Sequence, residues 1–400
     1  MRGISGVAVR GKRILLRVDL NVPIEEGKIV PGARIEAHAK TIKSLSDKGA
    51  MVIVLSHQGR KGKSDFSSLE QHAKHLHHII KKDVAYVTDV CGPEAKEAIG
   101  KMKDGDILVL ENVRSLDDEL QNDGQIVKEL TPFADYFVLD ALSVAHRDHA
   151  SVTGFTKAIP SFAGPNLLDD VEALDKLRHS KDIIFVLGGS KVEDSFEIMK
   201  KWLSDGRARK ILVCGALATL LLHAKGHKIG DSMEFLNRSS MESHCDQAKQ
   251  LLFEFNDRIA LPVDVGLQID SKRHDCDVEE IHRGLIWDIG PKTVEMYREN
   301  IFNSHTVVMN GPAGVYEMET FSNGTKGLLQ AIANCDAFSL LGGGHTVSAV
   351  EKFGIEKRHF SHISLAGKAL IEYLSGHPMP GLRALEENEK KFPLKKTDKK

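Results

Sequence analysis

Four arginines in the first 150 residues each end or closely follow an apolar run of strand type. They are Arg17 in ILLRVDLNVP, Arg60 in MVIVLSHQGR, Arg114 in ILVLENVR and Arg147 in YFVLDALSVAHR. Ligands of an open parallel α/β sheet bind beyond the carboxyl ends of its strands. Arginine presents a permanently charged fork that fits carboxylate and phosphate groups. The spacing therefore predicts a pocket for a small, highly anionic ligand.

In the second half of the chain, the apolar runs end mostly in glycine, where a backbone can turn sharply or approach a ligand closely. One of them leads into GGSKVEDS, where the start of a helix could receive an anion and Lys191 would add a positive charge. The same segment has a structural interpretation, because Ser190 and Glu193 form the S-x-x-E pattern of a capping box. The residues alone leave the two interpretations equally weighted.

Four other motifs carry less chemical information. LGGGHTVSAV fits neither G-x-G-x-x-G nor the Walker A pattern, and the only GKS lacks the first glycine of a P-loop because position 57 is histidine. Trp287 to Pro291 has the composition of a turn after an apolar stretch. The stretch LEQHAKHLHHII has an apolar face, so its histidines favour a solvated fringe over a metal site. Those histidines are His72, His75, His77 and His78, and the apolar face is Leu69, Ala73, Leu76 and Ile80.

Alternating strand and helix patterns must position these residues, which indicates an α/β protein with parallel sheets. A chain of 400 residues is too long for one ordinary core and predicts two domains. A helix is expected over 36–48, and another after Gly164-Pro165 could be an interdomain hinge or an ordinary surface helix. Strands are expected in the first half over 13–18, 50–56, 106–111 and 135–141.

The bulk properties are those of a globular, cytoplasmic protein. A formal net charge of −2 argues against a general nucleic-acid binder, and no apolar run has the length of a signal peptide or a membrane span. The five scattered cysteines suit a reducing compartment and indicate no structural zinc. The basic segment 390–400 is expected to be a solvated terminus.

Seven motifs in order resemble the phosphoglycerate kinase family: RVDLNVP, SHQGR, LENVR, AHRDHAS, GGSKVEDS, VMNGPAGVYE and GGGHT, over about residues 13–382. The resemblance implies two doubly wound parallel-sheet domains that face a cleft. The implied division is a 3-phosphoglycerate-binding domain over 1–163, a hinge helix over 164–180, a nucleotide-binding domain over 181–375, and a tail over 376–400 that returns to the first domain.

The resemblance also implies the roles of individual residues. Arg34 and Lys191 would act as catalytic residues on the transferring phosphoryl group, and Asp194 would be a metal contact to Mg²⁺ held mainly by nucleotide phosphates. The substrate site would comprise Asp19, Leu20, Asn21, Arg34, His57, Gln58, Gly59, Arg60, Arg114 and Arg147, whereas Arg17 would be structural. The nucleotide site would comprise Gly215, Asn310, Glu317, Gly343, Gly344, His345, Thr346 and Lys368.

Three positions depart from the commoner family pattern. Ser195 stands where a second lysine usually follows Lys191, His345 replaces the aspartate of GGGDT, and SLAGKA replaces STGGGA. Ser195 and His345 indicate an archaeal-type branch of the family. Lys368, within SLAGKA, is expected to restore part of the positive charge that Ser195 lacks.

The implied activity is reversible, Mg²⁺-dependent phosphoryl transfer between 1,3-bisphosphoglycerate and ADP, giving 3-phosphoglycerate and ATP. No general base is needed, because the acceptor carboxylate is already ionised at neutral pH. The alternative is a nucleotide-binding interaction protein that has lost transfer, which the presence of both Arg34 and Lys191 disfavours. A metal-dependent hydrolase lacks a coherent ligand set in the sequence. The expected partners are these small molecules, with no nucleic acid and no membrane, for a monomeric enzyme.

Overall fold

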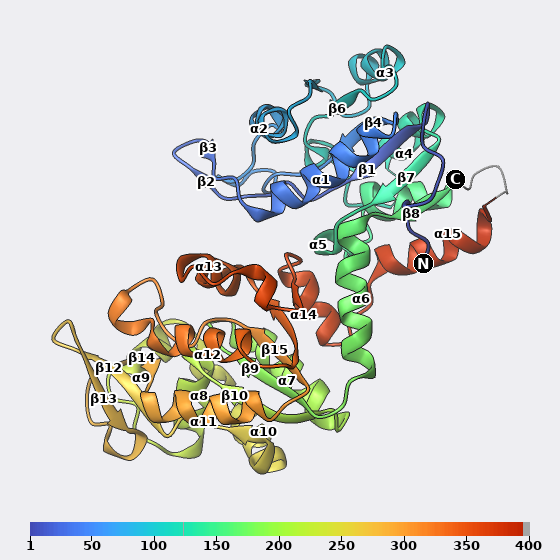
Figure 1. The fold of residues 1–400 in the computed structure, drawn as a ribbon. Helices are drawn as coiled ribbons and strands as arrows, with labels where there is room; N and C mark the ends of the chain where they lie inside the picture. Colours follow the sequence, from blue (N-terminus) through green and yellow to red (C-terminus); the bar gives the residue numbers. More distant parts are fainter. Residues whose placement is uncertain (123, 395–400) are drawn as a thin grey trace. The chain divides into compact units, whose positions relative to one another are not determined.

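The structure, a computed structural model, describes residues 1–122 and 124–394, so the end of the basic segment lies outside the described residues. The chain forms two compact units (Figure 1). Unit 1 comprises Met1–Glu172 together with His377–Lys400, and unit 2 comprises Ala173–Gly376. Helix α6 (Pro165–His179) contains the first boundary between them. No helix in the described part of the chain is long and apolar enough to cross a membrane.

Unit 1 is built on a six-stranded sheet in which all neighbouring strands are parallel, in the order β5-β6-β4-β1-β7-β8. The expected strands of the first half are confirmed, each within a few residues of its predicted bounds. The strands are β1 (Arg13–Arg17), β4 (Met51–Leu55), β5 (Val84–Tyr86), β6 (Ile107–Val109), β7 (Tyr136–Leu139) and β8 (Ser161–Ala163), with a separate hairpin of β2 (Ile24–Glu25) and β3 (Lys28–Ile29).

Helices cover this sheet because alternate residues of each strand face opposite sides. Ile14 and Leu16 of β1 belong to one core with the apolar faces of α1 (Ala33–Asp47) and α2 (Glu70–Ile80). Phe137 of β7 stacks on Phe155, which lies in the short helix η4 (Phe155–Lys157). The remaining helices of unit 1 are α3 (Pro93–Gly100), α4 (Gln125–Leu130), α5 (Leu142–Ala145), η1 (Val113–Ser115), η2 (Thr131–Phe133) and η3 (Ala150–Gly154).

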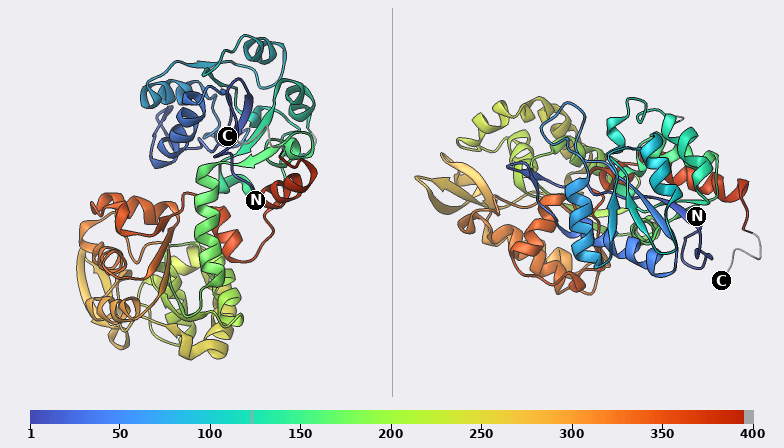
Figure 2. Two further views of the ribbon diagram at one scale, coloured as in Figure 1. Left: turned by 45° about the vertical axis from the view of Figure 1, so that its right-hand side comes forward. Right: turned by 90° about the horizontal axis from the view of Figure 1, so that it is seen from above.

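The last helix of the chain, α15 (Pro380–Lys391), packs on β8, α5, η3 and η4 of unit 1. It lies beside the amino terminus, where the Met1 ammonium is 3.4 Å from Glu389 Oε2 (Figure 2). The buried Asn388 joins it to strand β8 through a hydrogen bond from the Ser161 N–H at 2.8 Å. Two segments far apart in sequence therefore complete one core.

Unit 2 contains a second six-stranded parallel sheet, in the order β11-β10-β9-β15-β16-β17. Both sheets being parallel with helices on their faces, the predicted fold class of two doubly wound α/β domains is confirmed. The strands are β9 (Ile183–Leu187), β10 (Ala208–Val213), β11 (Ile259–Ala260), β15 (Thr306–Asn310), β16 (Phe338–Gly342) and β17 (His362–Ile363).

Strand β9 shows how unit 2 is layered. Its Ile184 and Val186 share a core with one set of helices, whereas Phe185 contacts Trp202 of α7. The first set is α11 (Pro291–Phe302), α12 (Asn323–Ala333) and α13 (Gly344–Lys352). The other helices are α7 (Val192–Ser204), α8 (Gly215–Lys225), α9 (Ser232–Arg238), α10 (Cys245–Phe255) and α14 (Lys368–Leu374).

A three-stranded antiparallel sheet is added to unit 2, and the sequence patterns did not predict it. It consists of β12 (Asp264–Ile269), β13 (Lys272–Asp277) and β14 (Leu285–Ile289). The prediction of a turn over 287–291 was wrong, because Trp287 to Ile289 belong to β14 and Pro291 begins α11. The run IALPVDVG is likewise divided between β11 of the parallel sheet and β12 of the antiparallel one.

Candidate active site

The strand order of unit 1 brings the arginine-bearing loops to one edge of its sheet. Strands β6, β4, β1 and β7 are neighbours and parallel, so their carboxyl ends point the same way. Arg17 is the last residue of β1, and the segments that follow β6, β4 and β7 carry Arg114, Arg60 and Arg147. The sequence pattern therefore identified a cationic sheet edge correctly.

Arg17 differs from the other three because it is almost completely buried. Its guanidinium donates to Ser151 Oγ at 2.8 Å and to the Val18 carbonyl, and lies 3.2 Å from His57 Nδ1. Burial lowers the pKa of Arg17, whereas Glu119 and Asp19 oppose that shift. The expectation that Arg17 is structural agrees with this environment.

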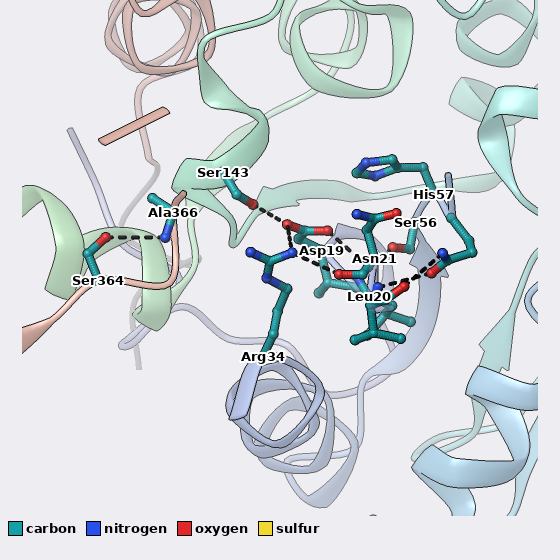
Figure 3. A network of polar contacts seen from close by, with 12 residues as sticks. Asp19, Leu20, Asn21, Arg34, Ser56, His57, Ser143, Ser364 and Ala366 are labelled. Carbon is teal, nitrogen blue, oxygen red and sulfur yellow. Dashed lines mark hydrogen bonds and ion pairs between the residues drawn. The ribbon is translucent and has the colours of Figure 1, made fainter. Parts of the chain in front are cut away.

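Asp19 and Arg34 form an ion pair just beyond the end of β1 (Figure 3). Asp19 Oδ2 lies 3.3 Å from an Arg34 guanidinium nitrogen and accepts the Ser143 hydroxyl at 2.5 Å. Arg34 lies in the first turn of α1 and also donates to the Asn21 carbonyl at 2.8 Å. Arg34, His57 and Ser143 hold the pKa of Asp19 well below its usual range despite its burial. Arg34 is therefore fixed by its anionic neighbour while about a quarter of its side chain stays exposed.

The loop after β4 is tied to Asn21 and Arg114. Gly59 donates its N–H to Asn21 Oδ1 at 2.7 Å, and its carbonyl accepts from the Arg114 guanidinium. Gly59 has φ +64°, and a Cβ there would lie 2.1 Å from the Asp65 carbonyl oxygen. Only glycine fits this turn without displacing the backbone.

Gln58 is buried, and its side-chain amide is engaged within the protein. It pairs with both backbone groups of Val22, at 3.0 Å and 2.9 Å, and donates to the Asp65 carbonyl at 3.1 Å. His72 Nε2 lies 3.1 Å from Gln58 Oε1. The prediction of a solvated histidine fringe was wrong for His72, which is fully buried, but the predicted apolar face of α2 is confirmed. These contacts support a structural role for Gln58 in shaping the loop.

Unit 2 contains a cavity of about 820 Å³. Gly215, Glu317 and His345, three residues predicted to bind nucleotide, line it. The wall between them is largely apolar and includes Ala216, Leu222, Val265, Leu285, Ile286 and Trp287. Size and lining suit a flat heterocycle with an attached sugar.

Trp287 and Asp288 line this cavity, and sequence reasoning missed both. Asp288 is fully buried and accepts from Arg273 at 2.7 Å and from the Gly324 N–H at 2.9 Å. Burial raises the pKa of Asp288 to about 6, although Arg273 opposes the rise. A Cβ on Gly314 would lie 2.5 Å from Asp288 Oδ1, so this buried pair supports the chain just before Glu317. An isolated aspartate after a hydrophobic run gave no signal of that role.

Helix α7 begins directly after Lys191, which is exposed. The capping-box interpretation was wrong: the N-cap is Lys191, without a side-chain cap among the described residues, and Glu193 instead lies 3.1 Å from His244 Nε2. Burial raises the pKa of Asp194, and the positive charges of Lys191 and Lys368 oppose that rise. Both lysines therefore lie within electrostatic reach of the same carboxylate. Ser195 is buried, and its hydroxyl donates to the Lys191 carbonyl at 3.4 Å.

Two glycine-rich strand ends lie against each other at Asn310 and Gly343. Gly343 has φ +87°, and a Cβ there would lie 2.8 Å from Asn310 Oδ1. That buried oxygen has no hydrogen-bond partner among the described residues. Thr346 accepts the Gly311 N–H on its hydroxyl at 2.9 Å. His345 and Glu317 are both largely exposed, with 3.6 Å between Nδ1 and Oε1.

The described residues contain no group of three or more His, Cys, Asp or Glu side chains that could hold a metal ion by itself. Asp194 and Asn310 each carry a side-chain oxygen donor in unit 2. Isolated hard donors fit Mg²⁺, which is usually bound by one or two protein oxygens together with substrate phosphates.

Comparison with known proteins gives one consistent result. A family model described as phosphoglycerate kinase matches residues 4–377. A phosphoglycerate kinase of Methanothermus fervidus is 39% identical over 95% of this chain and 96% of its own length, and one of Methanothermobacter thermautotrophicus is 40% identical over 96% of both. The crystal structure of the Pyrococcus horikoshii enzyme superposes with a TM-score of 0.92 at 36% identity, over 98% of this chain and 100% of that one.

Proposed function

This chain belongs to the phosphoglycerate kinase family and is a kinase, and we propose that its two units divide the substrates between them. Unit 1 would bind 3-phosphoglycerate, and unit 2 would bind ATP or ADP. The main support for this division is that the candidate sites of the two units are lined by different kinds of residue. The sheet edge of unit 1 presents arginines, whereas the cavity of unit 2 is largely apolar with glycines at the strand ends beside it.

In unit 1, Arg60, Arg114 and Arg147 would hold the phosphate that is not transferred. His57 would hold that phosphate together with them, and Asp19 and Asn21 would face the glycerate hydroxyl and carboxylate region. Arg34 is the arginine that we assign to the moving phosphoryl group. Its contacts with Asp19 and with the Asn21 carbonyl fix its guanidinium before substrate arrives. A preorganised charge costs little rearrangement at the transition state.

In unit 2, Lys191 would complete the charge around the transferring group from a flexible, exposed side chain. Glu317 would bind the ribose, and Gly343, Gly344 and Thr346 would contact the phosphates. Asp194 and Asn310 Oδ1 would face Mg²⁺, which neutralises phosphate oxygens when it is bound with the nucleotide. With His345 in place of the usual aspartate, the metal would depend more on nucleotide oxygens and on Asp194, and Lys368 would restore part of the positive charge that Ser195 lacks.

The attacking group in the direction that consumes ATP is a carboxylate, which needs no proton removed. Catalysis would therefore consist of alignment and charge stabilisation without a general base. The role of residues 164–180 as a hinge, the monomeric state and the cytoplasmic location stay predictions.

A coupled assay with 3-phosphoglycerate and MgATP tests this function. We expect turnover, and we expect Lys191→Ala to lower kcat much more than it raises either KM, because its contact forms at the transition state. Lys200→Ala, an exposed lysine on the same helix, is the matched control and should leave both constants unchanged. Well-folded protein that binds ATP without turnover would favour the alternative of a nucleotide-binding interaction protein.

A further inference from the structure

Behind the cationic edge of unit 1 lies a buried chain of hydrogen bonds that the proposed mechanism does not use. Glu119 is 1% exposed, and its two carboxylate oxygens accept from the same residue. Oε2 accepts the Ser151 N–H at 3.1 Å, and Oε1 accepts the Ser151 hydroxyl at 2.6 Å. Ser151 Oγ in turn lies 2.8 Å from Arg17 Nε. The chain ends at His57, whose Nδ1 is 3.2 Å from the Arg17 guanidinium.

The two contacts of Arg17 have a fixed direction, because arginine can only donate. Ser151 Oγ therefore accepts from Arg17 and directs its own hydrogen to Glu119. Burial raises the pKa of Glu119 to about 7, and the charge of Arg17 and the two Ser151 hydrogen bonds oppose that rise. The same rule makes His57 Nδ1 an acceptor, because the group facing it is also Arg17. An imidazole that accepts at Nδ1 is neutral and carries its hydrogen on Nε2.

We propose that Glu119, Ser151 and Arg17 form a positioning relay that holds His57 as the neutral Nε2–H tautomer, so that it donates a hydrogen bond to the anionic substrate. The inference rests on the proposed function, which places 3-phosphoglycerate in unit 1. Glu119 and Ser151 are not catalytic residues, since they act only through Arg17 and His57. Without Glu119, the hydrogen-bond chain that orients the Arg17 Nε would be broken. The buried Arg17 guanidinium would also lose a neighbouring carboxyl group that favours its charge.

The charges around His57 agree with this assignment. Burial lowers the pKa of His57 to about 3; Arg17, Arg147 and Arg34 act in the same direction, and Asp19 opposes them. The cationic edge therefore disfavours an imidazolium at neutral pH. A neutral His57 ring can donate a directional hydrogen bond to the substrate without adding a further positive charge beside the arginines.

The direct test is the state of the His57 ring in the unliganded, full-length protein. Nitrogen-15 NMR of histidine-labelled protein distinguishes the two neutral tautomers from the imidazolium, and His57→Gln identifies the His57 signals. We expect the Nε2–H tautomer at pH 7, persisting to about pH 5 because the folded-state pKa lies near 3. Either an imidazolium or the Nδ1–H tautomer at pH 7 would overturn the proposal.

A second test measures coupling through the relay by calorimetric titration with 3-phosphoglycerate. Glu119→Gln and Ser151→Ala should each weaken binding about tenfold, the usual worth of a hydrogen bond to a charged group. Neither should change affinity for ATP, which binds in unit 2. The loss should shrink strongly in a His57→Gln background, because the relay acts through that ring. Fully additive losses would contradict the relay and indicate a structural role.

Glu129→Gln provides the matched control, since Glu129 is a half-exposed acid of unit 1 that pairs with Lys96. It should leave both affinities unchanged. If the wild type does not bind 3-phosphoglycerate, the proposed function fails, while the NMR measurement still decides the relay. If Glu119→Gln does not fold, Ser151→Ala and the wild-type ring signals decide it.

Discussion

Asn388 offers a direct test of how the end of the chain stabilises unit 1. Its side chain is 1% exposed and satisfies several backbone groups at once. Oδ1 accepts the Ser161 N–H at 2.8 Å and an Arg2 guanidinium N–H at 3.2 Å. The amide nitrogen donates to the carbonyls of Thr156 and Ile159, at 2.6 Å and 2.8 Å. Asn388→Ala therefore removes a buried junction between α15, β8 and η4.

The expected loss follows from the groups left behind. The Ile159 carbonyl keeps the Ser161 hydroxyl at 2.9 Å, so the Ser161 N–H and the Thr156 carbonyl bear most of the cost. A buried polar group without a partner costs about 1–3 kcal/mol, which gives a loss of about 2–6 kcal/mol for the two. Arg383→Ala is the matched control because Arg383 is an exposed residue of the same helix and pairs across one turn with Glu387. Its loss should stay within about 0.5 kcal/mol.

Urea unfolding can assign this loss to unit 1. Both tryptophans of the chain, Trp202 and Trp287, lie in unit 2, so tryptophan fluorescence reports unit 2 alone. Far-ultraviolet circular dichroism reports both units, and two units need not unfold together. We expect Asn388→Ala to move the dichroism transition to lower urea by more than it moves the fluorescence transition. A loss as small as that of Arg383→Ala would refute the reasoning that Asn388 satisfies otherwise orphaned backbone groups.

Three further predictions concern the site. Gly59→Ala should weaken 3-phosphoglycerate binding and leave ATP binding unchanged in calorimetry, because the new Cβ would meet the Asp65 carbonyl at 2.1 Å and displace the loop; unchanged substrate affinity would contradict this. Burial lowers the pKa of His72 to about 4, so protonation of this one residue should cost stability as pH falls from about 6.5 toward 4, by at most about 3 kcal/mol. His72→Gln should flatten that dependence in urea titrations at pH 7 and 5, and an equal slope would count against it. Lys368→Ala should weaken ATP binding, since its charge reaches Asp194; an unchanged ATP affinity would disprove its role at the phosphates.

Much of the architecture was predictable because local patterns encode it. The period and length of the apolar runs located β1, β4, β6 and β7 of the first parallel sheet but missed β5 and β8. The alternation of these runs with amphipathic stretches indicated the α/β class. The sequence pattern alone assigned four arginines to one edge of the first sheet, because the carboxyl ends of neighbouring parallel strands point the same way. They are Arg17, Arg60, Arg114 and Arg147. The seven ordered motifs identified the family, and the family match over 4–377 agrees with them.

The antiparallel sheet could not be predicted in the same way. Strand β13 is mostly polar and half exposed, so it shows neither the alternation nor the apolar run of a typical strand. Its pairing with β12 depends on register across a turn. The other two strands of this sheet, β12 and β14, contribute Val265 and Trp287 to the cavity wall. Sequence patterns detect a buried face, and this sheet has little of one.

The burial and the partners of each arginine depend on the tertiary structure. Arg17 and Arg34 have the same charge and chemistry, and the apolar runs favoured Arg17 as a ligand. Folding brings Ser151, 134 residues away, onto the Arg17 side chain and encloses it, whereas the first turn of α1 presents Arg34 beside Asp19 with part of its surface exposed. The sequence by itself determined where positive charge would gather. Burial and hydrogen-bond partners distant in the chain determined which charge remains available to a substrate, because desolvation and pairing depend on neighbours in space.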